Sequence, residues 1–182
     1  KAIFLRPLTI SKLRNAAKRL VHFTPDTAFH NGRSSHFEKT LMQYDLLVTT
    51  KSFDVAEYLV RAGRDVVHLT TQGYDARVHF PRNGNDERRR EVVFVGLAEP
   101  DRERCIETLL AHRITVRVAG LGWDRLVHRH RSNQNLVFDG SGAFGDEYAR
   151  LLSRAWIGLG LLSKRFPELH TTRTFEIPAC GA

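Results

Sequence analysis

The sequence predicts an α/β fold made of two units, each built around a parallel β-sheet. Short apolar runs alternate with helical patterns along most of the 182 residues, and this alternation is typical of sheets assembled from βαβ units. The alternation is interrupted once, at residues 74–91, where Pro81, Gly84 and a dense run of charges indicate a linker. We therefore expect one unit over residues 1–85 and a second over residues 86–182.

Four strands are expected in the first unit, at residues 2–5, 21–24, 45–50 and 65–69. A first helix is expected after a cap at Thr9 or Ser11, because its apolar residues recur at helical spacing; they are Leu13, Ala16, Ala17 and Leu20.

Two more helices follow in the first unit. A short one is expected from His36 to about Tyr44. Ser52 is expected to cap the other, which ends at Gly63, and Phe53, Ala56 and Val60 would form its buried side.

The second unit repeats the same alternation. Strands are expected at residues 92–95, 115–119, 136–138 and 156–162, and helices at residues 100–112 and 146–155. The stretch from His128 to Arg131 resembles a solvated basic loop, since no further metal-binding residue accompanies its two histidines.

The composition favours a globular protein in a reducing compartment. The chain is 42% hydrophobic, and no apolar run is long enough to span a membrane. Its two cysteines, Cys105 and Cys180, are far apart and lack a metal-binding spacing, which favours a cytoplasmic location. The net charge of +8 fits either an anionic partner, such as a nucleic acid or an anionic membrane face, or a solvated arginine-rich surface.

Ligands of open parallel sheets bind beyond the carboxyl ends of the strands. In the second unit Gly96 follows the first expected strand and Gly120-Leu121-Gly122 follows the second. Glycine allows a ligand to approach the backbone N–H groups closely. The Gly-Leu-Gly segment lacks the third glycine of a dinucleotide fingerprint, so a tight turn explains it equally well.

The segment after the last expected strand carries the strongest chemical signal. Glu168 and Glu176 form an E-x7-E pattern that encloses Thr172 and Arg173, and Lys164 precedes it. Carboxylates accept hydrogen bonds from sugar hydroxyls, whereas Arg, Lys and Thr donate them to phosphate oxygens. A ligand with both groups, such as a nucleotide sugar, would use both sets. A helix with surface ion pairs is the alternative explanation.

The ending "TTRTFEIPACGA" resembles the signature of CgeB-like proteins, a branch of the group 1 (family 4-type) glycosyltransferases. Upstream stretches agree with this branch, and they are "VHFTPDTAFH", "YDLLVTTK", "GYDARVHFP" and "VVFVGLAEPDR". The resemblance implies a GT-B architecture of two Rossmann-like domains, with the acceptor side first and the donor side second. It also implies that both units are incomplete and that the chain is an internal fragment of a longer enzyme. The first strands of the first domain would precede it, and further strands and helices would follow a helix that begins near Pro178.

The resemblance also implies roles for individual residues. Glu176 would bind the donor ribose, and Glu168 would face the sugar at the reacting end. Arg173, with Thr172 and more weakly Lys164, would bind the diphosphate, which the backbone at Gly96 would approach closely. Asp26 is a candidate catalytic base, although a turn residue after Pro25 is the simpler explanation.

The expected activity is therefore transfer of a sugar, with retained configuration, from a nucleotide sugar that is most often UDP-linked in this superfamily. The resemblance implies that cationic side chains and helix N-termini, not a bound metal, stabilise the leaving diphosphate, and the absence of an Asp-x-Asp motif agrees with this. No cofactor is expected besides the nucleotide sugar, which is a substrate. The acceptor and the oligomeric state are not readable from the sequence. Three alternatives stay open: a nucleotide-sugar-binding protein without transfer, a nucleotide-sugar epimerase, and a basic nucleic-acid-binding protein. The last is disfavoured, since no RNA- or DNA-binding signature is present.

Overall fold

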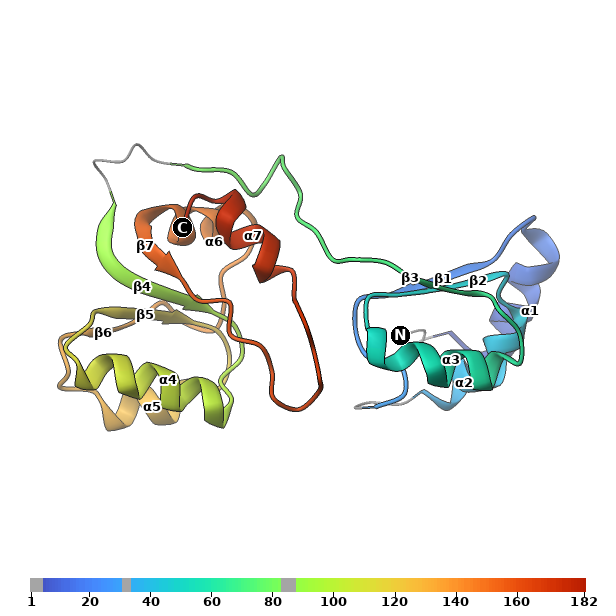
Figure 1. Ribbon diagram of the computed structural model, residues 1–182, viewed down its shortest axis with the longest axis horizontal. Helices are drawn as coiled ribbons and strands as arrows, with labels where there is room; N and C mark the ends of the chain where they lie inside the picture. The colour runs from blue at the N-terminus through green and yellow to red at the C-terminus, as the bar shows by residue number, and fades with distance from the viewer. Residues whose placement is uncertain (1–4, 31–33, 83–87) are drawn as a thin grey trace. The chain divides into compact units, whose positions relative to one another are not determined.

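The computed structural model describes residues 5–30, 34–82 and 88–182, which form two compact units (Figure 1). The units divide between Gln72 and Gly73, whereas the expected boundary between residues 85 and 86 lies outside the described residues. The division comes earlier because the end of the expected linker is fixed to the second unit. The backbone N–H of Arg82 donates to Oγ of Ser153 at 3.1 Å.

The first unit contains a three-stranded parallel sheet. Its strands are β1 (Val21–Thr24), β2 (Leu46–Thr49) and β3 (Val67–Leu69), and their spatial order is β1-β2-β3. The expected strand at residues 21–24 is confirmed, and the next two are each shorter than expected. The expected strand at residues 2–5 falls largely outside the described residues.

The helices of the first unit are α1 (Pro7–Ala16), α2 (Ser35–Thr40), η1 (Leu41–Gln43), η2 (Ser52–Asp54) and α3 (Val55–Ala62). The expected caps Thr9 and Ser11 lie inside α1, because proline fits the first turn of a helix and Pro7 starts it earlier. The expectation that the helix continues to Leu20 was also wrong.

The side of helix α3 that faces the core differs from the side predicted from its apolar residues, which were Phe53, Ala56 and Val60. Tyr58 and Ala62 are buried, whereas Val60 is 82% exposed. Asp54, not Ser52, is the N-cap residue, and the backbone N–H of Ala28 donates to its buried carboxylate. This inward-facing carboxylate sets the rotation of the helix. The predicted end at Gly63 is confirmed, with a left-handed φ of +63°.

The second unit contains a four-stranded parallel sheet. Its strands are β4 (Arg89–Val95), β5 (Val116–Ala119), β6 (Leu136–Phe138) and β7 (Ala155–Gly158), in the order β6-β5-β4-β7. The chain moves outward from β4 through β5 to β6 and then returns to place β7 on the other side of β4. The direction therefore reverses between β4 and β7, and such a switch point is where open α/β sheets bind ligands.

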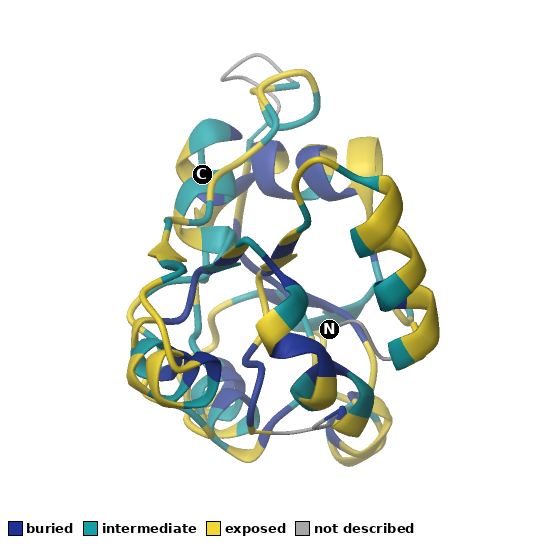
Figure 2. Cartoon of the chain, turned by 90° about the vertical axis from the view of Figure 1, so that its right-hand side faces the viewer, coloured by how far each residue is buried: buried dark blue, intermediate teal, exposed yellow. Residues whose placement is uncertain are grey.

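Helices cover both faces of this sheet. They are α4 (Pro100–Ala111), α5 (Asp124–Arg129), α6 (Gly145–Arg154) and α7 (Arg173–Ala179); α4 and α5 lie on one face, and α6 and α7 on the other (Figure 1). The side chains of β4 alternate between two cores. Phe94 packs in a cluster with Ile106 of α4, and Val93 packs in a cluster with Ile177 of α7. Along the helices, buried and exposed residues alternate, because one side of each helix faces a core and the other faces solvent (Figure 2).

Four expectations for the second unit need correction. Strand β4 begins at Arg89, three residues before the expected start, and β7 ends at Gly158 instead of residue 162. The expected basic loop is partly helical, since α5 contains His128 and Arg129. Helix α7 begins at Arg173 and contains Pro178 near its end. The other expected strands and helices of this unit are confirmed to within about one residue.

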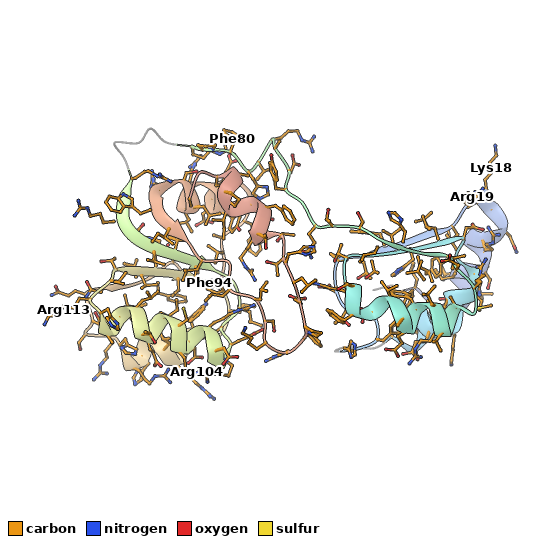
Figure 3. The ribbon with its side chains drawn as sticks, in the orientation of Figure 1. Lys18, Arg19, Phe80, Phe94, Arg104 and Arg113 are labelled. Carbon is orange, nitrogen blue, oxygen red and sulfur yellow. The ribbon has the colours of Figure 1, made fainter. Side chains whose placement is uncertain are left out.

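Several basic side chains lie at the molecular surface. Lys18, Arg19, Arg104 and Arg113 are exposed, whereas Phe94 lies in the interior of its own unit (Figure 3). Among the residues that the structure describes, no helix combines the length and apolar character needed to cross a membrane.

Candidate functional site

The loops at the carboxyl edge of the second sheet pass very close to one another. The backbone N–H of Gly96, after β4, donates to the carbonyl of Ala119, and that of Gly120 donates to the carbonyl of Gly140. A Cβ atom on Gly120 would lie 2.0 Å from the carbonyl oxygen of Gly96. Glycine is therefore required at position 120 for the two strand ends to meet.

A pocket of about 320 Å³ opens beside Gly96, and we call it the α7 pocket. Its walls include Gly96, Thr172, Arg173 and Glu176, which are four of the site residues expected from the sequence. Thr172 and the two charged residues belong to the start of α7, so one helix brings a hydroxyl, a guanidinium and a carboxylate to the end of β4.

The carboxylate of Glu176 is held by groups from other parts of the second unit. The hydroxyl of Tyr148, on α6, donates to Oε2 of Glu176 at 2.9 Å, and Nε2 of His79 lies 3.7 Å from Oε1. Burial, followed by the charge of Glu176, raises the pKa of Tyr148, so its hydroxyl stays protonated and acts as a donor. Burial and the same charge raise the pKa of the Cys180 thiol to about 11, which makes it unreactive.

Arg173 lies where β4 ends. Its Nη1 and Nη2 atoms are 3.4 Å from the carbonyl oxygens of Val95 and Leu161, respectively. Its Nε atom is buried and has no hydrogen-bond partner among the described residues. A Cβ atom on Gly96 would lie 3.2 Å from Nη1, so glycine there leaves room for the guanidinium. The arrangement places a positive charge next to accessible backbone.

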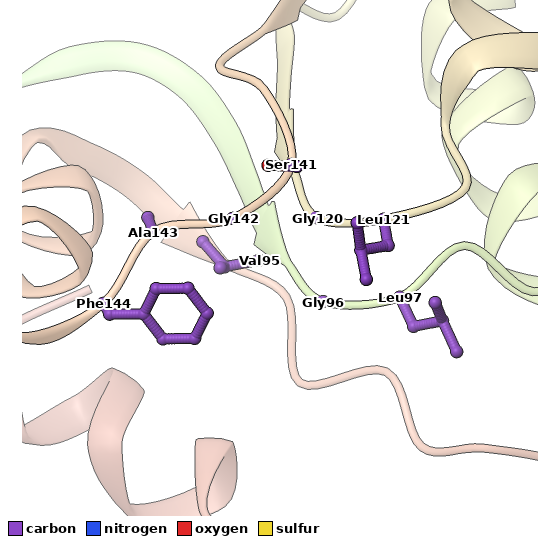
Figure 4. A pocket seen from close by; sticks show the side chains of 9 residues that line it. All are labelled: Val95, Gly96, Leu97, Gly120, Leu121, Ser141, Gly142, Ala143 and Phe144. Atoms are coloured by element: carbon purple, nitrogen blue, oxygen red, sulfur yellow. The ribbon is translucent and has the colours of Figure 1, made fainter.

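An apolar pocket of about 220 Å³ adjoins the α7 pocket, and the two share Val95, Gly96, Ala143 and Phe144 (Figure 4). Phe144 is 84% exposed and Leu121 is 62% exposed, so accessible apolar side chains border the charged pocket. The loop at residues 141–144 was not among the site segments expected from the sequence. Its glycine-rich pattern, "DGSGAFGD" directly after a strand, is the signal that it contains.

Glu168 and Lys164 do not line the α7 pocket. Both line a separate hollow of about 370 Å³ formed by residues 162–168. Glu168 interacts electrostatically with Arg102 of α4. Burial lowers the pKa of Arg102, and the charges of Glu99 and Glu168 offset only part of that decrease. The E-x7-E pattern therefore places its two glutamates in different hollows, because an irregular segment separates them. The roles of Glu168 and Lys164 stay predictions.

Asp26 lies in the first unit, directly after β1, and it is exposed. The buried carboxylate of this region is Asp54, which the sequence analysis missed; it accepts from Ala28 N–H at 2.7 Å and lies 3.5 Å from Nε2 of His30. The proposed role of Asp26 as a base stays a prediction. In the part of the chain that the structure describes, no three His, Cys, Asp or Glu side chains cluster closely enough to hold a metal ion.

The comparison with known families is decisive for the second unit. Residues 88–182, more than half of the chain, match the family described as glycosyl transferase-like. The chain belongs to this family. No curated protein matches it, and the expected CgeB-like branch therefore stays a prediction.

The glycosyl transferase-like chain is also similar to the solved structure of an alpha-glucosyltransferase in complex with UDP and a 13-mer DNA containing a central A:G mismatch. The TM-score is 0.61 at 15% sequence identity, and the match covers 96% of this chain and 53% of that chain. The present chain thus spans about half the length of that enzyme. The fold class expected from the sequence, two Rossmann-like parallel-sheet units of the GT-B type, is confirmed.

Proposed function

We propose that this chain carries the donor site of a glycosyltransferase that takes a sugar from a nucleoside diphosphate sugar. The observation that carries the proposal is the convergence of Glu176, Arg173 and the Gly96 backbone in one pocket, at the switch point of a parallel sheet. Membership of the glycosyl transferase-like family supports the same conclusion.

The two adjoining pockets match the three chemical parts of a nucleoside diphosphate. The apolar pocket, with the exposed ring of Phe144, suits an aromatic base. The carboxylate of Glu176 suits the ribose hydroxyls, and the guanidinium of Arg173 suits the diphosphate. We take UDP as the first candidate nucleotide, because the similar alpha-glucosyltransferase was solved in complex with UDP.

Transfer breaks the bond between the anomeric carbon and a diphosphate oxygen, and an acceptor oxygen forms the new bond as it loses its proton. Negative charge develops on the departing diphosphate, so a fixed positive charge beside it lowers the barrier. We assign this task to Arg173, with Lys164 as a weaker candidate, and no metal ion is required in this proposal. Retention of configuration and the catalytic roles of Glu168 and Asp26 are further predictions.

A thermal-shift titration with UDP, GDP, ADP and CDP tests the proposal directly. A ligand present at a hundred times its dissociation constant stabilises the folded state by about 2.7 kcal/mol. We expect one diphosphate to raise the unfolding temperature of the wild type. The Glu176→Gln variant should need about ten- to a hundredfold more of it, since a charge-assisted hydrogen bond is worth about 1.5–3 kcal/mol.

Glu147→Gln is the matched control, because Glu147 is an exposed residue of α6 outside the α7 pocket. It should respond to the nucleotide like the wild type. Absence of any shift with all four diphosphates would contradict the proposed donor site. Release of sugar from the bound donor in the presence of acceptor then separates an enzyme from a protein that only binds.

Nucleic acid is the second candidate partner. The net charge of +8 favours it, and the similar alpha-glucosyltransferase was solved with DNA as well as UDP. Binding through phosphate contacts weakens steeply with salt. Fluorescence anisotropy with a labelled oligonucleotide at low and high salt measures this dependence, and binding that UDP does not displace would indicate a separate acceptor surface.

A further inference from the structure

The segment at residues 75–82 was expected to be a linker, yet it is attached along the helices of the second unit. The guanidinium of Arg82 donates to Asp146 of α6 at 2.6 Å and lies 3.8 Å from the ring centre of Phe80. Pro81 lies close to Gly181, where an added Cβ would be 3.3 Å from the proline ring. The segment therefore packs against the second unit, with contacts to α6 and to the residues that follow α7.

A tight turn within this segment fixes the imidazole of His79. The backbone N–H groups of Val78 and His79 both donate to the carbonyl of Asp75. Hydrogen bonds from Arg77 lower the pKa of Asp75 to about 2, so its carboxylate stays charged and holds the turn closed. Nδ1 of His79 lies 3.1 Å from the backbone nitrogen of Asp75 and 3.2 Å from its carbonyl oxygen.

The other edge of the ring faces the α7 pocket. Nε2 of His79 lies 3.7 Å from Oε1 of Glu176, and the ring meets that of Tyr148 edge-on at 5.8 Å between centres. Because Nδ1 faces both the N–H and the carbonyl of Asp75, these contacts are compatible with either tautomer. The carboxylate of Glu176 beside Nε2 favours the tautomer with its proton on Nε2, in which Nδ1 accepts the N–H of Asp75. At 3.7 Å, Nε2 and Oε1 are too far apart for a hydrogen bond, so an Nε2–H group would remain available to a ligand in the α7 pocket.

We propose that His79 is a second ligand of the ribose diol in the α7 pocket, opposite Glu176. This inference rests on the proposed donor site. Each hydroxyl of a vicinal diol donates one hydrogen bond and accepts others. The carboxylate of Glu176 provides the acceptors, and Nε2–H of His79 provides a donor beside it. The pair thus matches a ribose and penalises a nucleotide that lacks one hydroxyl.

The side-chain chemistry supplies a matched pair of variants. The amide nitrogen of a glutamine extends about as far as Nε2 of histidine, so His79→Gln keeps a donor near the diol. The shorter asparagine in His79→Asn reaches only as far as Nδ1 and removes that donor. His128→Asn is the control, because His128 is an exposed residue of α5 outside both pockets.

The experiment is isothermal titration with UDP, GDP, ADP and CDP, followed by the 2′-deoxy and 3′-deoxy counterparts of the tightest binder. The wild type should bind at least one deoxy counterpart about tenfold more weakly. In His79→Asn this preference should be about three- to fivefold smaller, the remainder coming from Glu176, whereas His79→Gln and His128→Asn should retain most of it. Thermal unfolding of each variant confirms that it is folded.

The outcomes separate this inference from the proposed function. A wild-type protein that binds none of the four diphosphates contradicts the donor site itself. A wild type that prefers the ribose form, together with a folded His79→Asn variant that keeps the full preference, overturns the role of His79 alone.

Discussion

The hydroxyl of Tyr148 and the carboxylate of Glu176 are joined by a 2.9 Å hydrogen bond that links α6 to α7 at the edge of the α7 pocket. The two residues are 28 positions apart in the chain. Tyr148 is 8% exposed, so water has little access to its hydroxyl. The hydroxyl therefore keeps the Glu176 carboxylate in one orientation. The bond ties the shape of the pocket to the packing of two helices.

The Tyr148→Phe variant should therefore bind the nucleoside diphosphate about three- to tenfold more weakly, since Glu176 loses the group that orients it. The effect should be the same at pH 7 and pH 9, because the raised pKa of Tyr148 keeps the wild-type hydroxyl protonated throughout that range. Isothermal titration measures both values. Tyr74→Phe, at an exposed position of the same unit, is the control, and an equal loss there would refute the explanation.

The Arg173→Lys variant should distinguish diphosphate binding from a structural role. Lysine keeps the charge but loses the planar fork that binds phosphate oxygens in pairs. Affinity for UDP should fall about tenfold, whereas affinity for uridine should change less than about twofold. Competition titrations of the two ligands measure the difference, with Arg150→Lys on the exposed side of α6 as a control. Equal losses for UDP and uridine would show that Arg173 only supports the strand ends.

The Gly120→Ala variant should lose about 2–4 kcal/mol of unfolding free energy, because its Cβ would collide with the Gly96 carbonyl at a backbone φ of +141°. Gly140→Ala offers a comparison, since its φ is +89° but no atom lies within 4 Å of the added Cβ. It should lose only about 1–2 kcal/mol from backbone strain. Denaturant unfolding gives both values, and similar losses would mean that the loops separate easily.

His22 should make the first unit sensitive to mild acid. Its ring is buried and stacks on Phe37 at 4.2 Å, and burial lowers its pKa from 6.5 to about 4. Between these two values the unfolded chain binds a proton that the folded chain does not, so stability is complete above pH 6.5 and falls as the pH decreases towards 4. The loss between pH 8 and pH 5 should be about 2 kcal/mol.

The His22→Phe variant isolates this contribution, since it removes the titrating group and keeps an aromatic ring on Phe37. Urea unfolding followed by circular dichroism at pH 8 and pH 5 should show a smaller acid loss in the variant. The same loss in both proteins would assign the acid sensitivity to other groups.

Local sequence signals predicted most of the strands, because apolar β-type runs mark the buried strands of a parallel sheet. They failed where local and tertiary preferences differ. Helix α5 was missed because half of its six residues, "DRLVHR", are charged and it buries only Leu126. The rotation of α3 was wrong because its side facing the core is set by the buried carboxylate of Asp54, whose partners lie far away in the sequence.

In the candidate site, too, local sequence signals predicted only the residues that are close together in the chain. Arg173 and Glu176 are three residues apart on one helix, so a sequence motif could place them together. His79 enters the α7 pocket from the segment before β4, and Phe144 and Tyr148 enter it from the start of α6. No local pattern relates either segment to α7. Glu168 illustrates the reverse case, since its position in the same motif did not bring it into the same pocket.

Among the residues that the structure describes, those lining the α7 pocket and the apolar pocket all belong to the unit that starts at Gly73. Under the proposed function, the side chains assigned to the nucleotide are therefore inherited together as one segment of the gene. Exchange of residues before Gly73 leaves each of these side chains unchanged. Chimaeras that join this second unit to the first unit of a relative should therefore keep the nucleotide preference of the protein that supplied the second unit.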